Sequence, residues 1–240
     1  MLSAEGLRHA FGTGGGRVVA LDNVSFSLEA GQTLAIFGPN GAGKTTLLKV
    51  LAGLIRPDAG RATVAGGRGA IGWIGHQSHL YGHLTVRENL LFWAALYAVP
   101  ATIRATRADA TLRQLGIADR AEQAVWSLSR GLAQRAAIAK ALIHDPPVLL
   151  LDEPFTGLDL AAAAEFRALL ARLQGAGRVV VLATHNVGEG VELATDVAFQ
   201  RRGRFVHFAP RGARGPAQIA DEYRRAVGEG EGEGEGEADD

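Results

Sequence analysis

Residues 38–46 read GPNGAGKTT, and no other segment constrains the fold as strongly. The segment fits the pattern G-x-x-x-x-G-K-[ST], in which glycines let successive backbone N–H groups point toward phosphate oxygens. An apolar run at 33–37 predicts a buried strand before it, and the pattern of 46–54 predicts a helix after it. This order favours a phosphate-binding loop over a plain glycine-rich turn. The candidate nucleotide-binding residues are Gly38, Pro39, Asn40, Gly41, Ala42, Gly43, Lys44, Thr45 and Thr46.

Two acidic residues follow a second apolar run, at 148–151. Such a run suits a parallel strand covered on both faces, and ligands of such sheets bind at the carboxyl ends of the strands. Neighbouring strand residues point in opposite directions, so Asp152 and Glu153 can take different roles. We expect Asp152 and the Thr45 hydroxyl to support Mg²⁺, Lys44 to reach the terminal phosphates, and Glu153 to orient or deprotonate a water molecule.

Residues 128–135, here named the signature segment, read LSRGLAQR, and Ser129 precedes Asp152 by 23 positions. Together with the two preceding motifs, this order resembles the ATPase subunits of ATP-binding cassette (ABC) proteins over about residues 1–208. The resemblance implies that Ser129, Arg130 and Gly131 cap the γ-phosphate bound to an opposite subunit. Arg130 replaces a glycine and Leu132 a glutamine of the family's LSGGQ pattern.

The same resemblance assigns roles to four further residues, one by one. Gln77 resembles the glutamine that senses Mg²⁺ and water. The resemblance implies that it is catalytic and that it also belongs to the residues around Mg²⁺. His185 resembles the histidine that contacts the γ-phosphate. Asp159 resembles the aspartate that crosses the dimer interface. Phe11 resembles the aromatic residue that stacks on adenine, a role for which its flat ring is suited, although a lone aromatic residue is more often part of a core.

The fold class predicted from these features is α/β, a P-loop NTPase (RecA-like) core with a mixed sheet, an N-terminal antiparallel β part and an inserted helical subdomain. Thr85 and Glu88 form a capping-box pattern that predicts a helix start. The motif GRGAIG at 67–72 precedes its strand instead of following it, which argues against a dinucleotide site. The predicted divisions are an ABC nucleotide-binding domain at 1–227, with core 1–84 and 146–208, helical subdomain 85–145 and C-terminal helix 216–227, and a disordered acidic Gly/Glu tail at 228–240.

The composition and the apolar runs of the sequence limit the kinds of site, the location and the partners that the chain can have. The absence of cysteine excludes disulfides and thiolate metal sites. The longest apolar stretch, 90–99, is far shorter than the ~20 residues that cross a bilayer, and no signal segment is visible, so the membrane path is expected on permease subunits. The chain itself is expected at the cytoplasmic face of the inner (plasma) membrane. The 25 basic residues equal the 25 acidic ones and are scattered, so no nucleic-acid partner is expected.

The segment 73–99 resembles the haem-exporter ATP-binding subunit of bacterial cytochrome c maturation. The resemblance lies in the sequence GHQ and the pattern L-T-x-x-E-N-L. It implies a subunit that powers export of haem or a haem-related step. The alternatives are the ATPase of another exporter, for drugs or lipids, and a soluble ABC protein, which usually needs two cassettes or a coiled-coil insertion. Direct haem or metal ligation by His76, His79 and His83 is the less favoured interpretation of those side chains. The expected partners are ATP with Mg²⁺, a second copy or paired ABC subunit, and the permeases.

Overall fold

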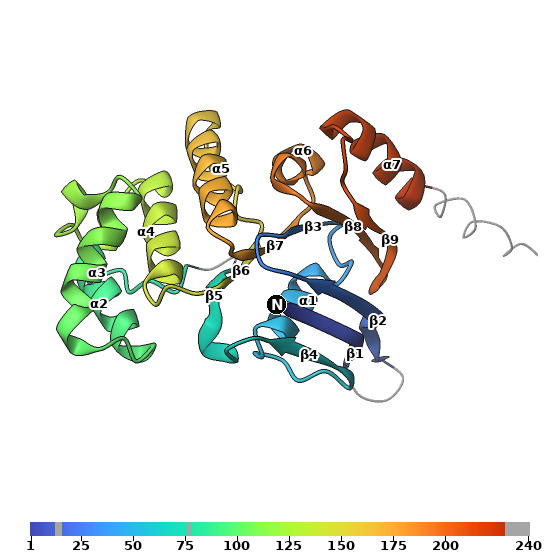
Figure 1. The fold of residues 1–240 in the computed structure, drawn as a ribbon, viewed down its shortest axis with the longest axis horizontal. Helices are drawn as coiled ribbons and strands as arrows, with labels where there is room; N and C mark the ends of the chain where they lie inside the picture. Colours follow the sequence, from blue (N-terminus) through green and yellow to red (C-terminus); the bar gives the residue numbers. More distant parts are fainter. Residues whose placement is uncertain (13–15, 76–77, 229–240) are drawn as a thin grey trace, which may run out of the picture.

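The computed structural model describes residues 1–12, 16–75 and 78–228, and its strands form two sheets (Figure 1). A three-stranded antiparallel sheet has the order β2-β1-β4, and a six-stranded sheet has the order β5-β6-β7-β3-β8-β9. In the larger sheet, β5, β6, β7, β3 and β8 run parallel and β9 pairs antiparallel with β8. The strands are β1 Leu2–Phe11, β2 Val18–Leu28, β3 Thr33–Phe37, β4 Ala59–Val64, β5 Ile71–Ile74, β6 Val148–Asp152, β7 Val179–Thr184, β8 Asp196–Arg201 and β9 Arg204–Pro210.

The strands β3, β6 and β7 of the larger sheet are apolar except for one end residue each (Thr33, Asp152 and Thr184), which suits strands covered on both faces. Every residue of β3, β6 and β7 is buried, as expected for a parallel sheet enclosed on both sides. The antiparallel N-terminal sheet, the mixed larger sheet and the helices confirm the predicted fold class.

The helices divide into those around the larger sheet and a group at one end of the molecule. α1 (Lys44–Leu51) packs between the two sheets, and its leucines share a core with residues of β1, β2 and β6. α2 (Val86–Leu96), α3 (Ala101–Gln114) and α4 (Arg130–Leu142) gather beyond β5 (Figure 1). The remaining helices are α5 Leu160–Gly175, α6 Val187–Gly190 and α7 Pro216–Gly228. Among the described residues, no helix combines the length and apolar character that a bilayer crossing requires.

α7 packs on one face of the larger sheet, over β8 and beside α6. Its Ile219 is fully buried, and Tyr223 packs edge-on against Phe199 of β8. The helix runs one residue beyond the predicted end, so Gly228 is helical and is not part of a tail. Residues 229–240, which hold the rest of the predicted tail, lie outside the described part of the chain.

The capping box predicted for α2 is present. The Thr85 hydroxyl accepts a hydrogen bond from the Glu88 N–H at 3.1 Å, and the Thr85 N–H donates to the Glu88 carboxylate at 2.8 Å. We expect Thr85→Ala to lower the free energy of unfolding by about 1 kcal/mol, because one backbone donor of the first turn loses its partner. Urea denaturation measures the change. Thr85→Ser, which keeps the hydroxyl, is expected to lose less than half as much, and an equal loss in the two variants would refute the capping role.

Candidate nucleotide-binding site

A cleft of about 560 Å³ opens at the carboxyl ends of three adjacent strands, β6, β7 and β3. The phosphate loop (38–46) follows β3, the two acids end and follow β6, and His185 follows β7. Residues from separate parts of the sequence thus meet at one edge of the sheet. The cleft is lined by Phe11, Val18, Val19, Ala20, Asn40, Gly41, Ala42, Gly43, Lys44, Thr45, Thr46, Asp152, Glu153, Thr156 and His185.

Two glycines of the phosphate loop are required by close packing. A Cβ on Gly43, whose φ is +102°, would lie 2.1 Å from the carbonyl oxygen of Ala20 in β2. A Cβ on Gly38 would lie 2.3 Å from the carbonyl oxygen of Gln200 in β8. Larger residues at these positions would push the loop away from both sheets. The loop is therefore fixed against the scaffold, with α1 beginning directly behind it.

Lys44 places a buried positive charge at the floor of the cleft. Its side chain is 7% exposed, and Nζ donates to the carbonyl oxygens of Gly38 at 2.7 Å and Pro39 at 3.2 Å. Nζ also lies 3.9 Å from Glu153 Oε1. Burial lowers the pKa of Lys44, and the nearby carboxylates of Glu153 and Asp152 oppose that change. Gly38 and Pro39, which do not line the cleft themselves, thus orient the lysine that does.

Glu153 is held by the end of β7. Its Oε1 accepts a hydrogen bond from the His185 backbone N–H and lies 3.0 Å from His185 Nδ1, and its Oε2 accepts from the Thr184 hydroxyl at 3.0 Å. Its φ of +49° falls in the left-handed region, which a residue with a side chain adopts only when its surroundings enforce it. The His185 side chain, 60% exposed, remains open to a group in the cleft.

Thr184 was not among the predicted site residues, although it directly precedes His185 at the end of an apolar strand. Thr184 also accepts a hydrogen bond from the Asn186 N–H at 3.1 Å, and the Asn186 amide donates to Glu189 at 3.0 Å. The carboxylate of Glu153 is therefore positioned by a chain of hydrogen bonds from β7 into α6.

Oxygen donors suited to Mg²⁺ meet beside Lys44. Asp152 is 4% exposed at the end of β6, and both Asp152 and Thr45 line the cleft. Mg²⁺ in nucleotide sites takes one or two protein oxygens and completes its shell with phosphates and water, so this donor set fits the ion. Gln77, predicted as both a catalytic and a metal-shell residue, lies outside the described residues.

The signature segment lies apart from this cleft. The Ser129 hydroxyl caps α4 by accepting from the Leu132 N–H at 3.4 Å, and Asp159 caps α5 by accepting from the Ala162 N–H at 2.8 Å. In the described part of the chain, neither these two residues nor Arg130 and Gly131 line the cleft. The Arg130 side chain lies instead over Gly157, where an added Cβ would be 2.8 Å from Arg130 Cδ.

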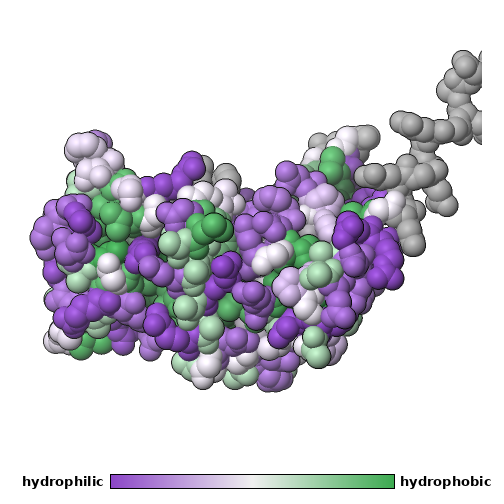
Figure 2. All heavy atoms as spheres, turned by 90° about the horizontal axis from the view of Figure 1, so that it is seen from above, coloured by the Kyte–Doolittle hydropathy of each residue, from purple (hydrophilic) through white to green (hydrophobic). Residues whose placement is uncertain are grey.

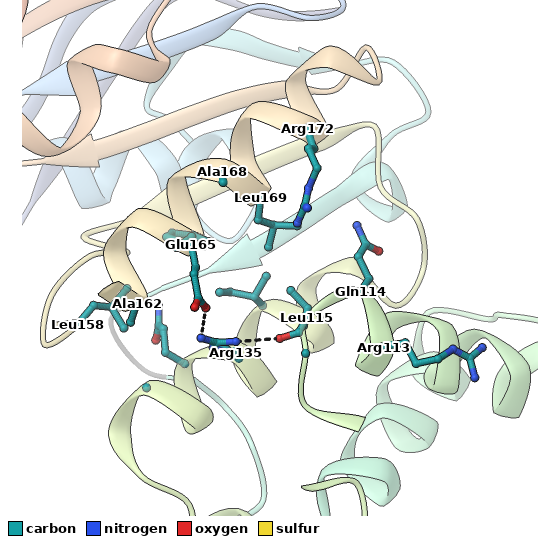
Figure 3. Close-up of a pocket in the computed structure, with 15 residues that line it drawn as sticks. Arg113, Gln114, Leu115, Arg135, Leu158, Ala162, Glu165, Ala168, Leu169 and Arg172 are labelled. Atoms are coloured by element: carbon teal, nitrogen blue, oxygen red, sulfur yellow. Dashed lines mark hydrogen bonds and ion pairs between the residues drawn. The ribbon is translucent and has the colours of Figure 1, made fainter. Parts of the chain in front are cut away.

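A second cavity, of about 320 Å³, separates α4 from α5 and the end of α3. Figure 3 shows Arg135 of α4 reaching Glu165 of α5 and the carbonyl oxygen of Leu115. Gly131 of the signature segment also lines this cavity. α4, which carries most of the signature segment, thus contacts α5 through the Arg135–Glu165 ion pair beside this cavity.

Comparison with known proteins identifies the family. A family model described as ABC transporter matches residues 21–156. A taurine import ATP-binding protein of Roseobacter denitrificans is 35% identical over 88% of this chain and 76% of its own length. A Nod factor export ATP-binding protein of Ralstonia nicotianae is 34% identical over 85% of this chain and 65% of its own length. Among the curated relatives compared, the chain spans from 56% to 81% of the relative's length.

The fold agrees with a solved structure of the same kind. The dimeric ATP-binding cassette MJ0796, in a post-hydrolysis state bound to ADP and Pi, superposes with a TM-score of 0.80 at 26% identity. The match covers 90% of this chain and 100% of that one. The chain therefore belongs to the ABC transporter family, as an ATP-binding subunit that hydrolyses ATP with Mg²⁺.

Proposed function

We propose that this chain powers a membrane transporter as one half of a dimer in which each subunit completes the nucleotide site of the other. The observation that carries the proposal is the separation of the two half-sites. The cleft holds the phosphate loop, Lys44, Glu153 and His185, whereas Ser129 and Gly131 lie outside it. A second copy, or a paired ABC subunit, brings Ser129 and Gly131 over the γ-phosphate, with Asp159 at the seam.

ATP enters the cleft with its phosphates on the loop. Backbone N–H groups of 40–46 and the positive end of α1 face the phosphate oxygens, and Lys44 adds its charge. Phe11 lies at the rim of the cleft and is 46% exposed, which leaves its ring available for stacking on adenine. Thr45 and Asp152, with Gln77, would hold Mg²⁺, which would neutralise part of the phosphate charge.

Glu153 is the general base in this scheme. Its carboxylate accepts hydrogen bonds from Thr184 and the His185 N–H, which fix its direction while leaving lone pairs for a water molecule. His185 stabilises the charge that develops on the transferring phosphoryl group. Loss of the γ-phosphate removes the group that joins the two halves, and the dimer reopens.

The transported species is proposed from the segment 73–99, whose likeness to the haem-exporter subunit of cytochrome c maturation favours export of haem or a haem-related step. Exposed aromatic residues of this region, Tyr81 and Phe92, offer a surface on which permease subunits dock at the cytoplasmic face of the inner membrane. The taurine import relative and a sulfate/thiosulfate import relative of Mycobacterium bovis favour a second candidate, import of a small sulfonate or sulfate.

Gene deletion in the source organism separates the two candidates. The first predicts loss of holocytochrome c, restored by the wild-type gene and not by Glu153→Gln. The second predicts normal holocytochrome c and lost uptake of a labelled sulfonate or sulfate. Normal holocytochrome c in the deletion strain would refute the haem assignment and leave the ATPase assignment intact.

A further inference from the structure

Besides Arg135, two side chains of α4 donate hydrogen bonds to backbone carbonyls outside the helix. Lys140 Nζ donates to the carbonyl oxygen of Ser78 at 2.8 Å, and Gln134 Nε2 donates to the carbonyl oxygen of Pro154 at 3.0 Å. Ser78 is the residue after Gln77, and Pro154 is the residue after Glu153. One helix thus donates hydrogen bonds to the backbone beside two of the residues that the proposed mechanism places near the γ-phosphate in the same subunit.

The Lys140 side chain is buried, so its ammonium group has been removed from water at a cost in free energy. The residue is 3% exposed, and its ammonium lies 5.1 Å from the centre of the Trp93 ring. Burial lowers its pKa to about 8. Within the described residues, no carboxylate lies at ion-pair distance from it. An apolar side chain would pack here without the desolvation cost, so what the lysine adds is the anchored Ser78 carbonyl and the contact with Trp93.

The N-terminal part of α4 belongs to the signature segment, which also includes Gln134. Ser129 caps the helix at its N-terminus, and Arg130 and Gly131 form its first turn. A continuous helix moves as a rigid rod over this length, because its backbone hydrogen bonds resist bending. A shift of the backbone at Ser78 or Pro154 is therefore passed to the residues that face the partner's nucleotide.

We propose that Lys140 and Gln134 are positioning residues that couple the nucleotide state of a subunit's own cleft to the signature segment it presents to its partner. This inference rests on the proposed two-subunit site and extends it. It makes α4 the element through which the two ATP sites of a dimer communicate.

The test compares Lys140→Met and Gln134→Met with Glu165→Gln in the full chain. Methionine keeps the length of both side chains and removes the donor. Glu165→Gln weakens the Arg135 ion pair between α4 and α5 (Figure 3) and touches neither carbonyl. Steady-state ATP hydrolysis over a range of ATP concentrations gives kcat, KM and the Hill coefficient, and thermal unfolding gives Tm.

Each methionine variant is expected to lose about tenfold in kcat, as the loss of one positioning hydrogen bond of ~1.4 kcal/mol predicts. The Hill coefficient is expected to fall from about 2 toward about 1, with KM changed less than about twofold. Glu165→Gln is expected to match the wild type. Wild-type kcat and Hill coefficient in the methionine variants would refute the coupling role and leave the proposed function untouched. The coupling role would also be refuted if Glu165→Gln showed the same losses, or if the losses were accompanied by a lower Tm. A wild-type chain without ATPase activity would refute the proposed function itself.

Discussion

Glu153→Gln is expected to reduce steady-state ATP hydrolysis by about 10³-fold or more while ATP binding persists. The amide has the size of the carboxylate and can still accept a hydrogen bond from Thr184, but it cannot take a proton from water. Removal of a general base costs typically about 10²–10⁴-fold, and here the γ-phosphate that holds the two halves together would also remain. Phosphate release measures the rate, and gel filtration with Mg-ATP measures the fraction of dimer.

Glu192→Gln is the matched control for this variant. Glu192 is 63% exposed, pairs with Arg167 and lies outside the residues that line the cleft, so the same chemical change there is expected to leave hydrolysis within about twofold of wild type. A Glu153→Gln protein that stays monomeric with Mg-ATP, or that hydrolyses ATP at a rate near the control, would contradict the assigned role.

Lys44→Met is expected to weaken ATP binding by on the order of 10²-fold. The lysine is a buried cation of the phosphate loop, and hydrogen bonds that involve a charged group contribute about 1.5–3 kcal/mol each. Isothermal titration with ATP in the presence of Mg²⁺ measures the dissociation constant. Methionine fills the same space, which limits the structural effect of the change.

Lys49→Met tests whether any lysine on α1 has this effect. Lys49 is an exposed residue of the same helix and does not line the cleft. Its replacement is expected to change the dissociation constant by less than about twofold, since an exposed charge is screened by solvent. Equal affinities in the two variants would show that Lys44 does not contact the phosphates.

Much of the nucleotide site could be predicted from the sequence because its residues follow strands in short, fixed motifs. The phosphate loop directly follows β3, Asp152 and Glu153 come at the end of β6, and His185 follows β7. Parallel strands end at one edge of a sheet, so three local patterns sufficed to place these groups together. Phe11 depended on resemblance alone, and it lies at the rim of the cleft.

The contacts of α4 could not be predicted in this way. Lys140 bonds to Ser78, which is 62 positions away, and Gln134 to Pro154, which is 20 positions away. A lysine among alanines indicates an exposed helix face, whereas tertiary packing buries this one. The packing of Arg130 over Gly157 likewise depends on the approach of two segments whose geometry no local pattern encodes.

The two-subunit site is tested most directly by mixing two inactive variants. Lys44→Met damages the phosphate loop, and Ser129→Arg damages the signature segment. In a mixed dimer, the intact loop of one chain meets the intact signature segment of the other, so one complete site forms. The account predicts that an equimolar mixture regains up to roughly a quarter of wild-type ATPase activity, because about half of the dimers are mixed and each has one intact site. Activity no higher than the sum of the separate variants would contradict it.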